Sequence, residues 1–318
     1  MRFKPVLPIL ITVLLTSCSN SVKTFESKIF PFDTFVDIKI MEGSRQNVKD
    51  IEAIFDHYDR LADNYRNRDI NNVFSINQTN DEIEVDEDLI KMLHESKNVI
   101  DNGANNFNPL CGSLAKKWKE ALANNTVLSN SVIEEELLKI QNSEIVFKEG
   151  DKVQRNGEAE IDLGGIAKGF ALDVVKRYFE EKEMTHYLIN AGSSSILLGE
   201  KNSKDGLFNV GLRDVDGAYL RLKNCFVSTS SISEQNYVID GVTYSHIINP
   251  HTGSAISVND AVVVVSNNGT QGDAFSTSMM MNTVEEIKEI EIIYNVKTLV
   301  IKNDEIIYQN PGIEVLYH

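Results

Sequence analysis

Hydrophobic and polar residues alternate from Phe35 to Met41, and this period of two predicts a β-strand. From Val48 to Leu61 the apolar residues instead recur every three or four positions, with Asp, Glu and Lys between them, which predicts an amphipathic helix. The same spacing predicts helices over residues 86–101 and 131–141. The first half of the chain therefore combines a strand with helices that each have one face to bury.

The second half of the chain is richer in strands. An extended segment, 158–163, ends in Gly164 and Gly165, and the pattern after them predicts a helix from about Ile166 to Glu183. Further helices are expected to open near Asp273 and to cover residues 284–294. Short apolar runs between turn residues predict strands at 186–190, 195–198, 207–212, 225–229, 243–248, 260–266, 297–301 and 305–308.

The order of these elements indicates the fold class. The run from Ala261 to Val265 contains no polar residue and predicts the most buried strand. Several strands follow one another late in the chain, so we predict an α+β fold with a largely antiparallel or mixed sheet packed with helices. No repeat or Pro- and Gly-rich linker interrupts the sequence after residue 31, and we expect residues 31–318 to form one large domain or two closely packed ones.

The N-terminus has the features of a secretion signal. Two basic residues precede an apolar run from Val6 to Leu15, which is too short to span a bilayer as a helix. The run ends in Leu-Thr-Ser-Cys, which resembles a bacterial lipobox, although a plain signal peptide cut elsewhere is the alternative. We predict a lipoprotein signal peptide at 1–17, lipidation of Cys18 and a polar tether at 18–30. The protein is then expected at the extracytoplasmic face of the bacterial cell membrane, held by its lipid anchor.

Composition narrows the class of function. The 318 residues are 42% hydrophobic and 25% charged, which is typical of a globular chain and excludes disordered and multipass membrane classes. Lys and Arg number 31 against 47 Asp and Glu, so the net charge of −16 disfavours nucleic-acid binding. The cysteines Cys18, Cys111 and Cys225 have no metal-binding spacing. We expect the last two to be buried small hydrophobic residues.

The segment from Ile161 to Phe170 is the strongest local signal. An extended stretch that ends in two glycines and begins a helix exposes backbone N–H groups at the positive end of the helix dipole, where phosphate commonly binds. Lys168 lies in the first turn, where the dipole opposes a cation, so its presence suggests a compensating anion. A purely structural tight turn is the alternative.

A second signal is the segment from Gly272 to Thr277. Asp273 and Thr277 are four residues apart, so a helix would place a carboxylate and a hydroxyl on one face, both suited to Mg²⁺. The alternative is that Asp273 only caps the start of a helix.

A third signal is a strand that runs into the turn Asn-Pro-His-Thr-Gly at 249–253. Alternation places Tyr244, His246 and Ile248 on one face, and a strand histidine is either structural or functional. Tyr65 followed by Arg66 could stack on a planar ring and meet its phosphates, or pack against the core.

These segments, in this order, resemble the ApbE family of FAD:protein FMN transferases from about Asp33 to Asn282. The family pattern D-L-G-G-I-A-K-G-Y-A-x-D is matched at 162–173, with Phe170 for Tyr. Its Y-S-H-I-I-D-P-x-T-G is matched at 244–253, and its A-D-A-x-[SD]-T at 272–277. Weaker matches lie at Thr34, at Tyr65, and at 107–118. The chain departs from the family pattern at 71–77, 190–196 and 229–231.

The resemblance implies an enzyme that transfers FMN from FAD to a Thr or Ser hydroxyl of an acceptor flavoprotein and releases AMP. It implies catalytic roles for His246, Asp273 and Lys168, and Mg²⁺ bound by Asp273, Thr277 and the carbonyl of Gly165. His246 would either act as the base or contact the phosphate. The implied FAD contacts are Thr34, Tyr65, Asn77, Pro109, Gly112, Glu160, Asp162, Gly164, Gly165, Lys168, Ser193, Thr229 and His246. Two other functions remain open: metal-dependent hydrolysis of FAD to FMN and AMP, and flavin binding by a lipoprotein without turnover.

Overall fold

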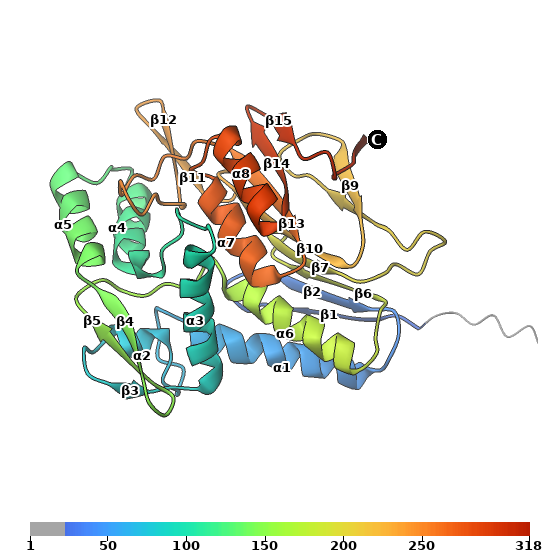
Figure 1. Cartoon of the computed structure of the whole chain (residues 1–318), viewed down its shortest axis with the longest axis horizontal. Helices are drawn as coiled ribbons and strands as arrows, with labels where there is room; N and C mark the ends of the chain where they lie inside the picture. Colours follow the sequence, from blue (N-terminus) through green and yellow to red (C-terminus); the bar gives the residue numbers. More distant parts are fainter. Residues whose placement is uncertain (1–22) are drawn as a thin grey trace, which may run out of the picture.

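The computed structural model describes residues 23–318. An eight-stranded sheet forms the centre of the fold (Figure 1). The strand order is β1-β2-β6-β7-β10-β13-β14-β15, and every neighbouring pair is antiparallel. These strands are β1 (Phe25–Ile29), β2 (Val36–Ile40), β6 (Tyr187–Ala191), β7 (Ser195–Leu198), β10 (Cys225–Ser231), β13 (Ala261–Ser266), β14 (Lys297–Lys302) and β15 (Glu305–Gln309). The α+β class with a largely antiparallel sheet is confirmed.

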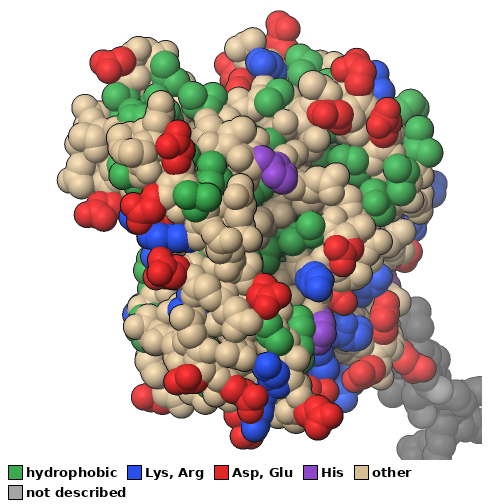
Figure 2. Space-filling model, turned by 60° about the vertical axis from the view of Figure 1, so that its left-hand side comes forward, with side chains coloured by type: hydrophobic (Ala, Val, Ile, Leu, Met, Phe, Trp, Pro, Cys, Tyr) green, Lys and Arg blue, Asp and Glu red, His purple; other side chains and the backbone are tan. Residues whose placement is uncertain are grey.

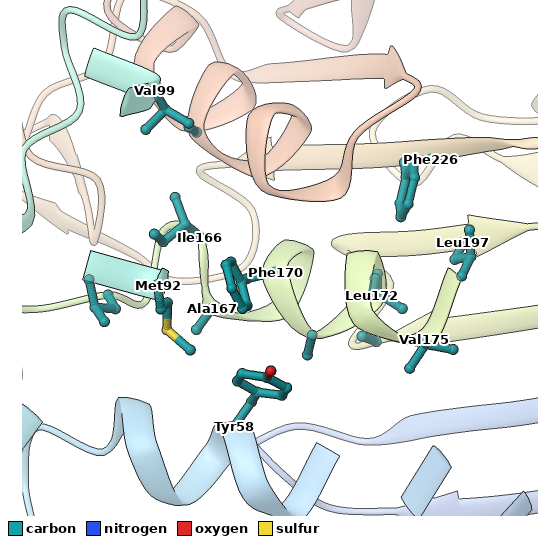
Figure 3. Packing of buried hydrophobic residues seen from close by; sticks show 14 of the residues in the cluster. Tyr58, Met92, Val99, Ile166, Ala167, Phe170, Leu172, Val175, Leu197 and Phe226 are labelled. Atoms are coloured by element: carbon teal, nitrogen blue, oxygen red, sulfur yellow. The ribbon is translucent and has the colours of Figure 1, made fainter. Parts of the chain in front are cut away.

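Four helices pack on one face of this sheet: α1 (Arg45–Ala62), α6 (Ala167–Glu181), α7 (Gly269–Met279) and α8 (Val284–Tyr294). Helix α3 (Glu87–Asp101) packs against α1 and α7. Helix α1 begins at Ser44, which forms a capping box with Asn47, and α1 lies beside α6 (Figure 1). In Figure 3, Tyr58 of α1 points toward Phe170 of α6, and the two ring centroids are 5.4 Å apart. The apolar side chains of these helices thus form one continuous core against the sheet.

A smaller sheet packs on the opposite face. It has the order β16-β9-β8 and contains β8 (Phe208–Gly211), β9 (Ala218–Leu222) and β16 (Val315–Tyr317). All six residues of β13 are buried, because Val262 and Val264 belong to the core under the helices while Val263 and Val265 belong to the core under the smaller sheet. Burial on both faces explains why this strand lacks the usual polar alternation.

The remaining elements form two peripheral groups. One contains α2 (Val73–Asn77), β3 (Ile83–Glu84), β4 (Glu144–Lys148) and β5 (Lys152–Asn156). The other contains the short 3₁₀ helix Pro109–Cys111, α4 (Gly112–Ala123), α5 (Asn130–Gln141), and the hairpin β11 (Asn236–Ile239) and β12 (Val242–Ser245). Trp118 of α4 stacks on Tyr244 with the ring centroids 5.7 Å apart, and its Nε1–H donates to the Gly253 carbonyl at 2.8 Å. These contacts fix both ends of the 244–253 segment to α4.

The structure corrects the expected element boundaries in four places. The tether expected at 18–30 overlaps β1, since Phe25–Ile29 pair with β2; residues 1–17 and Cys18 lie outside the described residues. The segment 158–163 is extended but joins no sheet, and β12 ends at Ser245 rather than Ile248. Helix α7 opens at Gly269, not near Asp273.

The surface of the described part is mixed in charge. On the face shown in Figure 2, acidic side chains are spread over the surface with basic side chains between them. Of the helices within residues 23–318, none combines the length and the apolar character needed to cross a bilayer.

Candidate functional site

A cavity of about 320 Å³ brings the three sequence motifs together. It lies among the first turn of α6, the middle of α7, the start of β7, the end of β10 and the residues that follow β12. The motifs contribute Asp162, Gly164, Gly165, Lys168, His246, Asp273 and Thr277 to its walls.

Asp273 reaches this cavity from the interior of α7. The cap of that helix is Asn268, whose side chain accepts a hydrogen bond from the Gln271 N–H. The interpretation of Asp273 as a helix cap is therefore wrong. Since Asp273 and Thr277 are one turn apart within α7, they lie on the same side of the helix, as their spacing predicted.

Helices α6 and α7 approach each other closely at two glycines. A Cβ on Gly169 would lie 2.2 Å from the carbonyl oxygen of Gly269, so a side chain is excluded there. The close approach allows the Gly169 N–H to donate to Asp273 Oδ2 at 2.7 Å. One first-turn amide that the sequence suggested for anion binding is thus already occupied by a carboxylate.

Two buried serines complete the surroundings of the Asp273 carboxylate. Ser228 Oγ lies 2.7 Å from Oδ1, and Ser195 Oγ lies 2.8 Å from Oδ1 and 3.0 Å from Oδ2. Burial raises the pKa of Asp273, while Lys168 and the hydroxyl and amide donors oppose that rise. Because a hydroxyl carries one proton, Ser195 donates to only one carboxylate oxygen at a time, which leaves a lone pair for a cation.

Gly165 and Thr277 line this side of the cavity. A Cβ on Gly165 would lie 3.7 Å from Thr277 Oγ1 and 2.9 Å from the Phe107 ring, so the main chain of Gly165 runs against Thr277. The carbonyl, hydroxyl and carboxylate of Gly165, Thr277 and Asp273 are hard oxygen donors of the kind that Mg²⁺ prefers. The donor set therefore fits that ion.

The segment 158–163 is held by side chains and loops rather than by a sheet. Asn77 pairs with Ile161 as a strand would: its Oδ1 accepts from the Ile161 N–H at 2.7 Å, and its Nδ2 donates to the Ile161 carbonyl at 2.9 Å. The Asp162 N–H donates to the Pro109 carbonyl at 2.7 Å, and the Gly112 N–H donates to the Glu160 carbonyl at 2.9 Å. These contacts fix the approach to the Gly164-Gly165 turn.

His246 lies at the mouth of the cavity, just after β12. Its Nδ1 is 3.5 Å from the Gln235 carbonyl oxygen. Desolvation by the cavity walls lowers the pKa of the imidazole, although part of the residue remains exposed, and the nearby Glu234 opposes this shift. The ring is therefore neutral at pH 7 and able to accept a proton.

Two further cavities, of about 340 and 190 Å³, adjoin the first around Tyr65. Tyr65 is 49% exposed, and Lys116 Nζ and Lys119 Nζ lie 4.8 and 5.1 Å from its ring centroid. An exposed aromatic ring beside two cations suits a planar, anionic ligand. Asp162 lines all three cavities, which therefore adjoin one another.

Some residues expected to contact FAD lie elsewhere. Thr34 packs against the Gly192 turn, and Glu160 forms an ion pair with Lys116 at 2.7 Å. Ser193 lines a separate cavity, whereas Thr229 lines both that cavity and the first one. Their contact with FAD stays a prediction.

The two cysteines of the described residues are partly buried. Cys111 forms part of the cavity wall, and burial raises its pKa to about 12. Burial also raises the pKa of Cys225 to about 12. Both are therefore protonated thiols at neutral pH.

Another group of potential metal ligands lies on the helical side of the molecule. His57, Asp86 and Asp88 have ligand atoms within 4.8 Å of one another. Asp86 caps α3, and Asp88 pairs with Lys91 at 3.1 Å and with His57 at 3.1 Å. Capping of α3 and ion pairing at the start of this helix therefore explain why these side chains lie together.

Three residues of the site could not be identified from the sequence. Ser195 appeared only as a departure from the family pattern, and nothing local marked Ser228 or Glu234. Both serines hold Asp273, and Glu234 lines the cavity near His246. Their positions depend on the sheet that aligns β7 with β10.

Comparison with known sequences decides the family. The profile described as the ApbE family matches residues 32–294. The chain belongs to the ApbE family. It is 26% identical over 215 residues to a FAD:protein FMN transferase of Treponema pallidum, which covers 61% of this chain and 59% of the relative. It is 28% identical over 222 residues to the protein of that name from Klebsiella pneumoniae, which covers 64% and 66%.

These ApbE relatives align over less than two thirds of their own length. The fold agrees more widely: a crystal structure of the ApbE protein of Thermotoga maritima superposes with a TM-score of 0.74 at 23% identity, covering 93% of this chain and 97% of that one. This chain thus has the fold of the ApbE family over nearly its whole described length.

Proposed function

We propose that this chain is a FAD:protein FMN transferase, which moves FMN from FAD to a Ser or Thr hydroxyl of an acceptor protein and releases AMP. Family membership and the names of the relatives support this. The observation that carries it is the convergence of Lys168, Asp273, Thr277 and the Gly164-Gly165 turn in one cavity, with His246 at its mouth. Lys168 provides local positive charge that outweighs the net charge of −16, since distant exposed charges are screened beyond about 10 Å.

In this reaction the acceptor oxygen forms a bond to the phosphorus of the FMN moiety. The bond from that phosphorus to the bridging oxygen breaks, and AMP leaves with the electron pair. Neutral His246 takes the proton of the acceptor hydroxyl, and Lys168 stabilises the negative charge on the phosphoryl oxygens. Positioning and charge neutralisation supply most of the catalysis, as is general for phosphoryl transfer.

We also propose that Asp273, Thr277 and the carbonyl of Gly165 hold Mg²⁺. A bound magnesium ion would neutralise pyrophosphate charge and orient the leaving group. The buried carboxylate, its free lone pair and the adjoining hydroxyl and carbonyl support this assignment.

Two other functions use the same residues: hydrolysis of FAD, with water in place of the acceptor, and flavin binding without turnover. One experiment separates the three. The chain is incubated with FAD, Mg²⁺ and a flavin-acceptor domain, and a denaturing gel is viewed under ultraviolet light while AMP is measured. A fluorescent acceptor band supports transfer, AMP without that band supports hydrolysis, and neither product supports binding alone.

We further propose that the protein is anchored by a lipid on Cys18 at the extracytoplasmic face of the cell membrane. The lipobox-like sequence supports this. Cys18 precedes the start of β1 at Phe25 by seven residues, which reach at most about 25 Å. The catalytic domain would then work close to the bilayer, on membrane-associated acceptors.

A further inference from the structure

A second cavity, of about 480 Å³, lies on the face of the large sheet opposite α6 and α7. Its floor comes from neighbouring strands of that sheet and is mostly apolar: Leu188 and Ile196 are half-buried, Val227, Val263 and Ile301 are buried, and Asn190 and Thr229 add polar groups. One wall is β8 with the residues that follow it, 209–214. We call this cavity the β8 groove.

The β8 strand offers main-chain hydrogen-bonding groups to this groove. Within residues 23–318, β8 pairs with β9 alone. The Leu212 N–H donates to the carbonyl of Ala218 at 2.9 Å, and bonded positions alternate along an antiparallel pair. The N–H and C=O groups of Asn209 and Gly211 therefore point away from β9, toward the free edge that lines the groove.

The β8 groove adjoins the 320 Å³ cavity that holds Asp273 and His246, which we call the catalytic cavity. Thr229 lines both. Arg213 of the groove pairs with Glu234 of the catalytic cavity, with Nη2 and Oε1 3.4 Å apart. Asp214 accepts hydrogen bonds from Ser231 Oγ at 2.9 Å and Ser233 Oγ at 2.6 Å, which fixes the end of the groove to the cavity wall. A chain lying in the groove would therefore pass close to Thr229, at the wall of the catalytic cavity.

We propose that the β8 groove binds the acceptor protein. An extended acceptor segment pairs with the free edge of β8, seats alternate aliphatic side chains on the mostly apolar floor, and presents its Ser or Thr hydroxyl past Thr229 to the phosphorus of FAD. Strand addition of this kind draws affinity from main-chain hydrogen bonds and specificity from pockets for alternate side chains. This inference rests on the proposed function.

The residues that line the cavities favour the acceptor, rather than the flavin, as the ligand of the β8 groove. Lys168, Lys119 and the aromatic ring of Tyr65 all line the three adjoining cavities on the other side of Thr229. Those groups match the phosphates and planar rings of FAD. The β8 groove offers instead a mostly apolar floor and a strand edge, which match a polypeptide.

Proline at Gly211 tests the proposal, with alanine as the matched control. Gly211→Pro removes the edge-facing N–H and leaves the β8–β9 ladder intact, because that N–H takes no part in it. Gly211→Ala keeps the N–H, and its Cβ would meet no atom within 4 Å. The measurements are FMN transfer to an acceptor domain modified by the wild-type chain, at varied acceptor concentration, and FAD affinity by flavin fluorescence.

We expect Gly211→Pro to raise the KM for the acceptor about tenfold while FAD affinity stays within about twofold, and Gly211→Ala to behave as wild type. The proposal is overturned if Gly211→Pro leaves the KM for the acceptor unchanged. It is also overturned if Gly211→Pro and Gly211→Ala raise that KM equally. If the wild-type chain hydrolyses FAD but modifies no acceptor domain, the proposed function fails and this inference with it.

A measurement on the wild-type protein decides the matter if Gly211→Pro does not fold. Hydrogen exchange is followed with and without an acceptor whose reactive Ser or Thr is replaced by Ala. Slower exchange at the amides of Asn209 and Gly211 supports strand pairing. Unchanged exchange at both amides contradicts it.

Discussion

At the scale of single residues, Asp273 has two roles that one carboxylate can serve together. It accepts the Gly169 N–H and so joins α7 to α6, and it faces the catalytic cavity beside Thr277. Its surroundings are made by hydroxyls, which hold a carboxylate without neutralising its charge. The site therefore keeps a buried negative charge available for a cation.

Asp273→Asn is the sharpest test of the metal assignment. We expect FMN transfer to fall at least about a hundredfold, because the variant loses the charge that binds the ion. The rise in melting temperature that Mg²⁺ gives the wild type should vanish. The metal-free variant should melt near the wild type, since removing a buried charge offsets the weakened hydrogen bonds. Transfer at a near wild-type rate, or an undiminished response to Mg²⁺, would refute the assignment; EDTA on the parent protein is the control.

The role of His246 has its own test. If the imidazole is the base, His246→Ala should lower transfer about a hundredfold while FAD affinity changes little. If it only holds phosphate, rate and affinity should fall together. In the wild type, kcat/KM should rise with pH through a pKa below the usual 6.5 of histidine, because only the neutral ring accepts a proton. Unchanged rate and affinity with a lowered melting temperature would leave His246 a structural role.

At this scale the sequence revealed only relations between residues that are close together in the chain. Asp273 and Thr277 share a helix turn, and Lys168 lies three residues after Gly165, so spacing alone placed them. Ser195 and Ser228 are 78 and 45 residues from Asp273, and their contacts with it exist only once the sheet has formed. No periodicity encodes such a pairing.

At the scale of elements, the contact between α6 and α7 sets the geometry of the site. Gly169→Ala would place a Cβ 2.2 Å from the Gly269 carbonyl oxygen, and neither helix backbone can move without shifting Asp273. We expect a loss of about 2 kcal/mol in the free energy of unfolding, net of the better helix propensity of Ala. FMN transfer should fall as well. Chemical denaturation measures the first effect and the gel assay the second.

Gly211→Ala serves as the control for that variant, since its Cβ meets nothing within 4 Å. Equal stability of the Gly169→Ala protein and the wild type would mean that the helices separate without cost, and that the close crossing does not position Asp273.

Helices and strands were predicted well where buried apolar residues recur at a regular spacing along the sequence. Helix α1 and strand β13 fall close to their expected ranges, because their apolar periods reflect burial. The strand β1 was missed because its alternation in Phe25–Ile29 is weak and only half-buried. The segment 158–163 was expected to be a strand because extended backbone has the same pattern, but its partner is the side chain of Asn77.

At the scale of the whole molecule, the large sheet separates two environments. The helical face carries the Gly164-Gly165 turn, where we propose that phosphate binds, and the proposed metal ligands, and the other face carries the β8 groove. The two meet at Thr229 on β10, whose neighbour Ser228 points to Asp273 on the opposite face. One strand thus links the cofactor side to the proposed acceptor side, a relation that follows from topology rather than from any local motif.

The attachment of the whole molecule to the membrane can be tested at Cys18. The lipobox-like sequence that ends at Cys18 predicts acyl chains on that cysteine, and such chains would give stable membrane association. We expect Cys18→Ser to move the protein from the membrane fraction to the soluble fraction of cells and to abolish incorporation of labelled palmitate. Transfer by the purified variant should stay within about twofold of wild type, because the lipid lies outside the fold and adds nothing to the cavity chemistry. If the variant stays with the membranes after a high-salt wash, attachment must come from a surface of the domain itself.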